Sequence, residues 1–137
     1  MRHKKKDKKL GRSGSHRKAL VASLVRGLIK ERRIKTTLPK AKTARSAAEK
    51  LVTLARKNTL ASRRLVASRL MNDAACAKIL VEDIAPQFLG RNGGYTRILK
   101  LGRRSSDSSE MALIEWVGIS APDKKKKKKE ETPKAAA

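Results

Sequence analysis

The chain has 137 residues, and its 36 Lys and Arg against 12 Asp and Glu give a net charge of +24. This length allows one domain with tails, and a hydrophobic fraction of 39% supports a small core but not a large cleft-bearing enzyme. No apolar stretch of about 18 residues is present, which predicts no membrane span, and the single cysteine cannot form an internal disulfide.

The positive charge is concentrated at both ends of the chain. Residues 1–18 carry a net charge of +8 and residues 124–137 carry +5, and both segments are poor in apolar side chains. Such segments bury too little surface to offset the loss of chain entropy, so we expect them to be disordered when free. We therefore predict a basic N-terminal arm at 1–14, a globular domain at 15–119 and a Lys-rich flexible tail at 120–137.

The first predicted helix begins near His16 and ends around residues 31–33. Ser15 precedes it as a candidate cap, because a serine at this position can accept a hydrogen bond from the first turn. The apolar positions follow the spacing of an amphipathic helix, which predicts one buried face. The residues that define this face are Leu20, Val21, Leu24, Val25 and Leu28.

A β-branched segment over 34–37 follows and predicts a short strand. Pro39 suits the first turn of a second helix, which we expect to run to about Lys57 because its apolar positions keep helical spacing. Alanine dominates the first half of this helix, so we expect a neighbouring backbone to pack close against it.

Polar caps mark two further helices. Asn58-Thr59 precedes a third helix over about 60–71, and Asn72-Asp73 opens a fourth that stops near residue 84, before Pro86. Cys76 lies on the apolar side of the fourth helix. We interpret it as a buried small hydrophobic residue rather than as a nucleophile or a zinc ligand.

The last part of the domain is predicted to be a β-hairpin. A turn at 92–94 precedes strands over 95–101 and 111–117, which a polar loop over 102–110 connects. The short strand at 34–37 is a candidate third member of the same sheet. The order helix, strand, three helices, two strands predicts an α+β fold, a two-layer domain in which helices pack on a small three-stranded sheet.

The sequence contains no recognisable catalytic or metal-binding pattern. Glycine-rich nucleotide motifs and nucleophile elbows are absent, and the two histidines, His3 and His16, lie among positive charges. The apolar run at 19–25 lies too far from the basic start for a secretory signal, and the Lys-rich start disfavours a mitochondrial transit peptide, which stays a minor alternative. We expect no enzymatic activity, no metal or other cofactor and no small-molecule substrate.

A pI near 11 points to a polyanionic partner, with nucleic acid as the first candidate and an anionic membrane surface as the second. Lys40 and Lys42 lie at the start of the second helix beside the hydroxyls of Thr36 and Thr37, which predicts a phosphate-binding corner. Further basic residues lie at the start of the first helix, on the third helix and on the hairpin: Arg12, Arg17, Lys18, Arg63, Arg64, Arg97, Lys100, Arg103 and Arg104.

Not every basic residue is expected to bind a partner. We expect about half of those in the globular part to be ordinary solvated charges, because exposed charges contribute little on average. Arg45 and Arg63 are candidates for ion pairs within the protein, with Glu49 and Glu82 as their acceptors.

Aromatic side chains are scarce, which bears on the mode of binding. Phe88, Tyr95 and Trp116 are the only three. Single-strand binders and RNA-recognition sheets need exposed aromatic platforms. We interpret Phe88 and Trp116 as core residues, which leaves only Tyr95 near basic residues on a predicted strand. This composition favours recognition of a folded nucleic-acid backbone over recognition of splayed bases.

Several segments together resemble the bacterial large-subunit ribosomal protein L-seventeen family. They are Met1-Arg2-His3, Ser15-His16-Arg17, the IKTTLPKAK string at 34–42, Arg63-Arg64 and the GGYTRI string at 93–98. The resemblance runs from Met1 to about Val117. The tail from Ala121 extends past the family's usual end, and residues 72–81 match the family pattern only loosely.

The resemblance implies an α+β domain that binds large-subunit ribosomal RNA without a catalytic role. It also implies a cytoplasmic location in the ribosome, on the solvent side of the large subunit near the exit of the peptide tunnel, beside other large-subunit proteins. The residues expected to bind RNA are Arg2, His3, Lys4, Lys5, Arg12, His16, Arg17, Lys40, Lys42, Arg63, Tyr95, Arg97 and Arg103.

A DNA-compacting protein is the alternative from a different class, since Lys-rich tails coat any duplex. Positive charge on tails, helix starts and a hairpin loop instead indicates a protein surrounded by folded RNA. Competition separates the two hypotheses. Duplex DNA of arbitrary sequence displaces a folded ribosomal RNA fragment at similar concentration only if the DNA hypothesis holds.

Overall fold

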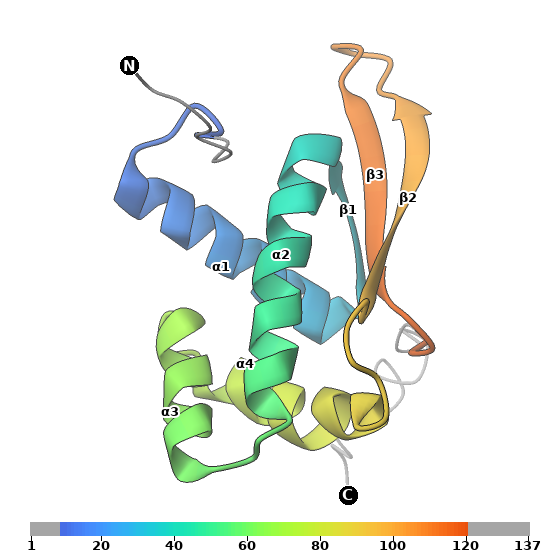
Figure 1. Cartoon of the computed structure of the whole chain (residues 1–137). Helices are drawn as coiled ribbons and strands as arrows, with labels where there is room; N and C mark the ends of the chain where they lie inside the picture. The colour runs from blue at the N-terminus through green and yellow to red at the C-terminus, as the bar shows by residue number, and fades with distance from the viewer. Residues whose placement is uncertain (1–8, 121–137) are drawn as a thin grey trace, which may run out of the picture.

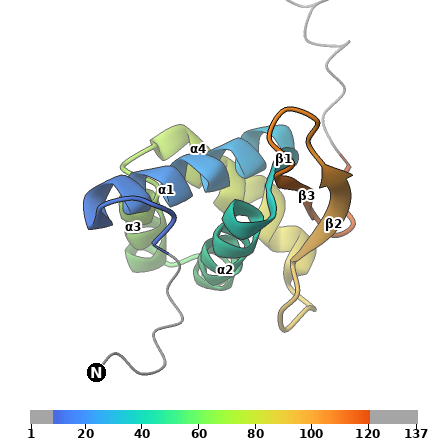
Figure 2. The same ribbon diagram turned by 90° about the horizontal axis from the view of Figure 1, so that it is seen from above.

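A computed structural model of the chain describes residues 9–120. All the helices lie on one side of a small sheet (Figures 1 and 2), which confirms the predicted two-layer α+β fold. The elements are α1 (Gly14–Glu31), β1 (Arg33–Thr37), α2 (Leu38–Ala55), α3 (Leu60–Arg69), α4 (Ala74–Ile79), β2 (Thr96–Arg103) and β3 (Glu110–Trp116).

The three strands form one antiparallel sheet in the order β1-β3-β2. β1 therefore joins the hairpin, as predicted, although three helices separate it from β3 in the sequence. Ile34, Ile114 and Ile98 lie side by side across the three strands. Ala112, Ile114 and Trp116 are all buried, so every second residue of β3 faces the helices.

The helix α2 lies in the middle of the molecule (Figure 1), where it packs against α1, against β2 and β3 of the sheet, and against α3. Its alanine-rich face is completely buried, at Ala41, Ala44 and Ala48. Because alanine has the smallest side chain of the good helix formers, this face lets neighbouring elements pack against α2 on several sides. Through these contacts α2 joins the other basic helices, α1 and α3, to the sheet.

Aromatic side chains close the core between the sheet and the helices. The indole Nε1–H of Trp116 donates to the carbonyl of Leu28 in α1 at 3.0 Å, in a buried site. The Phe88 ring lies 6.2 Å from that of Trp116 and 5.2 Å from that of Tyr95, measured between centroids. The interpretation of Phe88 and Trp116 as core residues is confirmed.

The helix caps agree with prediction at two starts and differ at one. The side chains of Thr59 and Ser62 each accept a hydrogen bond from the other's backbone N–H, which forms the capping box that begins α3. The prediction that Ser15 caps α1 is wrong. Ser13 has the extended backbone of a cap residue, so α1 begins at Gly14 and Ser15 is inside its first turn.

The segment predicted as the fourth helix consists of three consecutive helical segments of different type. Only Ala74–Ile79 is α-helical, and it continues as a π-turn over Leu80–Ile84 and a 3₁₀ turn over Ala85–Phe88. Pro86 therefore lies within the 3₁₀ turn rather than beyond the helix end. A proline is tolerated near the start of a helical turn because its missing N–H has no partner there.

Asp73 and Cys76 form the cap of α4, and Cys76 is buried as predicted. The Cys76 N–H donates to Asp73 Oδ1 at 3.0 Å, which lowers the pKa of Asp73, and the cations Lys30 and Arg26 lower it further. Burial raises the pKa of the Cys76 thiol, and the Asp73 carboxylate adds to that effect. The thiol is therefore neither exposed nor activated.

Replacing Asp73 by alanine is expected to cost about 1 kcal/mol of unfolding free energy at neutral pH, because the cap of α4 is lost. Since the folded pKa is lowered, the carboxylate contributes its full stability above its ordinary pKa of about 4 and loses it as pH falls through the folded pKa. Urea unfolding at pH 7 and at pH 2–3 measures the difference between the two proteins. It should shrink at the acidic pH, and a difference that stays constant would contradict this role for Asp73.

Candidate nucleic-acid interface

The charge is distributed unevenly along the described residues. Residues 9–72 contain 18 Lys and Arg but only two acidic residues, Glu31 and Glu49, whereas residues 73–120 contain six of each kind. The net positive charge of the described domain is therefore carried by the segment that contains α1, β1, α2 and α3. The positions of the acidic residues in the sequence are the signal for this uneven distribution.

A groove of about 1180 Å³ lies between α1, α2 and α3, within this basic part. Its lining includes no Asp or Glu. Small and aliphatic side chains from α1 and α2, among them Val21, Ala22 and Ala47, supply its apolar wall. All three helices contribute cations to it: Arg17 and Lys18 from α1, Lys42 and Lys50 from α2, and Arg69 from α3.

The cations of the groove are available to a partner. Lys18, Lys42, Lys50 and Arg69 are exposed, and within residues 9–120 no carboxylate lies within ion-pair distance of them. Arg17 is half-buried and donates to the carbonyl of Arg12 at 3.3 Å, which holds the start of α1. Ion pairs form elsewhere: Asp73 with Arg26 and Lys30, Asp83 with Arg32, Glu49 with Arg45, Glu82 with Lys78, Glu115 with Arg97, and Asp107 with Arg104.

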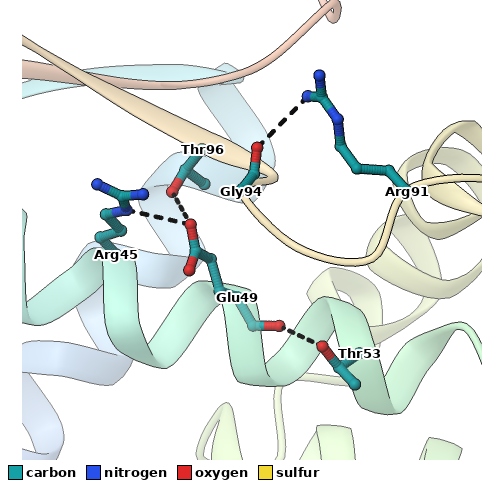
Figure 3. Close-up of polar contacts among 6 residues, drawn as sticks. All are labelled: Arg45, Glu49, Thr53, Arg91, Gly94 and Thr96. Carbon is teal, nitrogen blue, oxygen red and sulfur yellow. Dashed lines mark hydrogen bonds and ion pairs between the residues drawn. The ribbon is translucent and has the colours of Figure 1, made fainter.

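Glu49 is the only acidic residue of α2, and its carboxylate is already occupied (Figure 3). Its Oε1 accepts hydrogen bonds from Arg45 Nε at 3.1 Å and from Thr96 Oγ1 at 3.2 Å. The predicted pair of Arg45 with Glu49 is thus confirmed, and it ties α2 to the start of β2. Arg91, whose guanidinium donates to the Gly94 carbonyl at 3.4 Å, spans the loop before that strand.

The structure places several of the predicted RNA-binding residues in or near the groove. Arg17 and Lys42 line it, and Arg12, His16 and Lys40 lie close to the starts of α1 and α2. Lys50 and Arg69 also line the groove, although the sequence analysis did not single them out. Lys50 lies in the second half of α2 and Arg69 is the last residue of α3. Only the packing of the helices places both in the same groove.

Other predicted residues lie away from the groove. Arg97 and Arg103 are on β2, the edge strand that β3 separates from β1 and that does not line the groove. Arg63, on the exposed side of α3, donates to Asn58 Oδ1 at 2.8 and 3.0 Å. The predicted pair of Arg63 with Glu82 is therefore wrong. Arg2, His3, Lys4 and Lys5 lie outside the described residues.

Tyr95 is a core residue, with 2% of its surface exposed. Its ring packs on Phe88, and its hydroxyl accepts a hydrogen bond from Arg56 Nη1 at 2.8 Å. The same guanidinium donates to the carbonyls of Leu89 and Arg91, at 2.6 Å each. The ring therefore presents no open face to a nucleobase, which corrects the expectation that Tyr95 contacts RNA.

The hairpin tip is organised by its own charged residues. Arg104 donates twice to the carboxylate of Asp107, and the Ser109 hydroxyl and N–H donate to it as well. These donors hold the pKa of Asp107 well below its usual range, and the pairing raises the pKa of Arg104. Arg104 thus shapes the loop, whereas Arg103 is exposed and has no ion pair within the described part of the chain.

Two negative findings apply to residues 9–120. They contain no cluster of three or more His, Cys, Asp or Glu side chains that could hold a metal ion. None of their helices combines the length and apolar character needed to cross a membrane.

Comparison with known proteins identifies the chain's relatives. The family model described as "Ribosomal protein L17" matches residues 20–117. Proteins named large ribosomal subunit protein bL17 are similar over most of their length. The Methylacidiphilum infernorum protein is 54% identical over 89% of this chain and 92% of its own. The Fusobacterium nucleatum protein is 50% identical over 85% and 100%, and that of a Sulfurihydrogenibium species is 53% identical over 85% and 97%. These matches confirm the resemblance drawn from the sequence, and the chain belongs to the ribosomal protein L17 family.

Proposed function

We propose that this protein is a structural constituent of the large ribosomal subunit and not an enzyme. In that role it binds folded large-subunit ribosomal RNA and stabilises it through phosphate contacts. Membership of the family and the names of its relatives support the ribosomal role. The observation that carries RNA binding is the groove between α1, α2 and α3, which five cations line and no carboxylate does.

The groove suits an RNA backbone for physical reasons. Each phosphate that a Lys or Arg neutralises releases condensed counterions, so binding gains free energy without reading the bases. The cations come from three packed helices, and their Cα positions are therefore fixed relative to one another before RNA arrives. Such a preformed arrangement costs less ordering on binding than a flexible basic segment does.

Further contacts extend this interface beyond the groove. The basic arm at 1–14 and the tail at 120–137 add positive charge before and after the domain in the sequence. We assign the additional RNA contacts to Arg2, His3, Lys4, Lys5, Arg12, His16, Lys40, Arg63, Arg97 and Arg103. By family resemblance, the binding site is in the cytoplasmic ribosome near the exit of the peptide tunnel, beside other large-subunit proteins.

Sedimentation of a native lysate after a moderate salt wash tests the proposed function. Each fraction of a sucrose gradient is scored for the chain by mass spectrometry. We expect it to migrate with the large subunit at about one copy per particle. Recovery in the light fractions, or with the chromosome, would overturn the ribosomal role and favour the DNA-compacting alternative.

A further inference from the structure

Three serines line the groove, one from each of its helices. Ser15 belongs to α1, Ser46 to α2 and Ser68 to α3, and all three side chains are exposed. The cations alone would bind any polyanion, and the hydroxyl groups add a second kind of chemistry beside them. We propose that these serines bind ribose 2′-hydroxyls, so that the groove selects an RNA backbone over a DNA backbone.

The hydroxyl groups of these serines are free to bond a partner. Among residues 9–120, none of the three side chains has a hydrogen-bond partner. Thr43, which also lines the groove, differs because its hydroxyl donates to the carbonyl of Pro39 at 3.0 Å. A serine hydroxyl both donates and accepts, as a ribose 2′-hydroxyl does, so each can satisfy the other.

Cations and a hydroxyl group alternate along the α2 side of the groove. On α2, Lys42, Ser46 and Lys50 are four residues apart, so they project from the same face of the helix on successive turns. An RNA strand likewise alternates a phosphate with a ribose that carries a hydroxyl. Cations bind the phosphates whichever sugar is present, whereas the serines distinguish the two sugars.

The apolar wall of the groove sharpens this selection. Val21, Ala22 and Ala47 supply apolar surface between the serine hydroxyls, and the Thr43 hydroxyl is already bonded to Pro39. A DNA backbone pressed into the groove would displace water from those hydroxyls without replacing its hydrogen bonds, which is unfavourable. The wide and shallow minor groove of an RNA duplex displays its 2′-hydroxyls, so that is the surface the helices can reach.

This inference rests on the proposed function, and its test keeps the two apart. The full-length chain is titrated with an RNA duplex and with a DNA duplex of the same sequence, over a range of salt concentrations. The same titrations are made with a variant in which Ser15, Ser46 and Ser68 are all alanine. Ser23→Ala is the matched control, since Ser23 is an exposed serine of α1 that does not line the groove.

We expect the unmodified chain to prefer the RNA duplex, and the triple variant to lose RNA affinity by about two- to tenfold per hydroxyl. Its DNA affinity should not fall, because DNA makes no hydrogen bond to the serines, and its salt dependence should stay unchanged, as should all properties of Ser23→Ala. An RNA preference that survives in the triple variant would overturn the inference while leaving the proposed function intact. Failure of the unmodified chain to bind RNA at all would overturn both.

Discussion

Glutamate in place of Lys42, Lys50 and Arg69 is expected to lower the affinity for a folded ribosomal RNA fragment by about a hundredfold at 0.1 M salt. The logarithm of a binding constant falls with the logarithm of salt by about 0.7–0.9 per phosphate contact. Each contact therefore raises the binding constant about five- to eightfold when the salt concentration falls from 1 M to 0.1 M. Three lost contacts multiply to about two orders of magnitude, and the salt slope should fall by about 2–3.

The control for this variant changes the net charge by the same amount at exposed positions elsewhere. Lys78, Arg91 and Lys100 lie in the part of the domain where basic and acidic residues balance, and none of them lines the groove. Their replacement by glutamate should leave most of the affinity and the salt slope in place. An equal loss in both variants would show that net charge, and not the groove, determines binding. Circular dichroism of each variant establishes that it is folded.

The order of the elements follows from local signals in the sequence. The capping residues Thr59 and Asp73 are recognisable without a structure because a cap bonds to backbone N–H groups only a few residues away. The pairing of β1 with β3 is harder to predict. In this pairing Ile34 lies opposite Ile114, 80 residues further along the chain. The sequence predicts that a short strand joins a sheet, but it does not predict which strand is its neighbour.

The groove could be predicted only in part for the same reason. Arg17 and Lys42 lie near helix starts, where an anion site is expected from the local backbone. Arg69 lies at the opposite end of its helix, and its position beside them depends on how α1, α2 and α3 pack. Tyr95 is the opposite case. Its sequence neighbours, a predicted strand with several basic residues, favour an exposed ring, but tertiary packing turns the ring into the core.

Ion pairs also depend on tertiary contacts. Arg45 and Glu49 are four residues apart on one helix, so their pair is visible in the sequence. Arg97 and Glu115 meet only through the register of β2 with β3. Without that register, a cation already held by a carboxylate cannot be told from one that is free to bind phosphate.

Replacing Trp116 by alanine is expected to destabilise the domain by about 3–5 kcal/mol, which is a large part of the 5–15 kcal/mol typical of a folded domain. Trp116 is 1% exposed, packs near Phe88 and bonds to the Leu28 carbonyl, so its loss leaves a cavity and breaks the link between β3 and α1. Urea unfolding followed by circular dichroism measures the change. Tryptophan fluorescence cannot be used, because the variant lacks the chain's only tryptophan.

Two comparisons separate the indole hydrogen bond from the cavity. Trp116→Phe keeps an aromatic ring but cannot donate to Leu28, so it should cost about 1–3 kcal/mol. Leu65→Ala, at a side chain of α3 that is 42% exposed, should change the unfolding free energy by no more than about 0.5 kcal/mol. If Trp116→Ala cost as little as Leu65→Ala, the sheet would not be anchored to α1 through this residue.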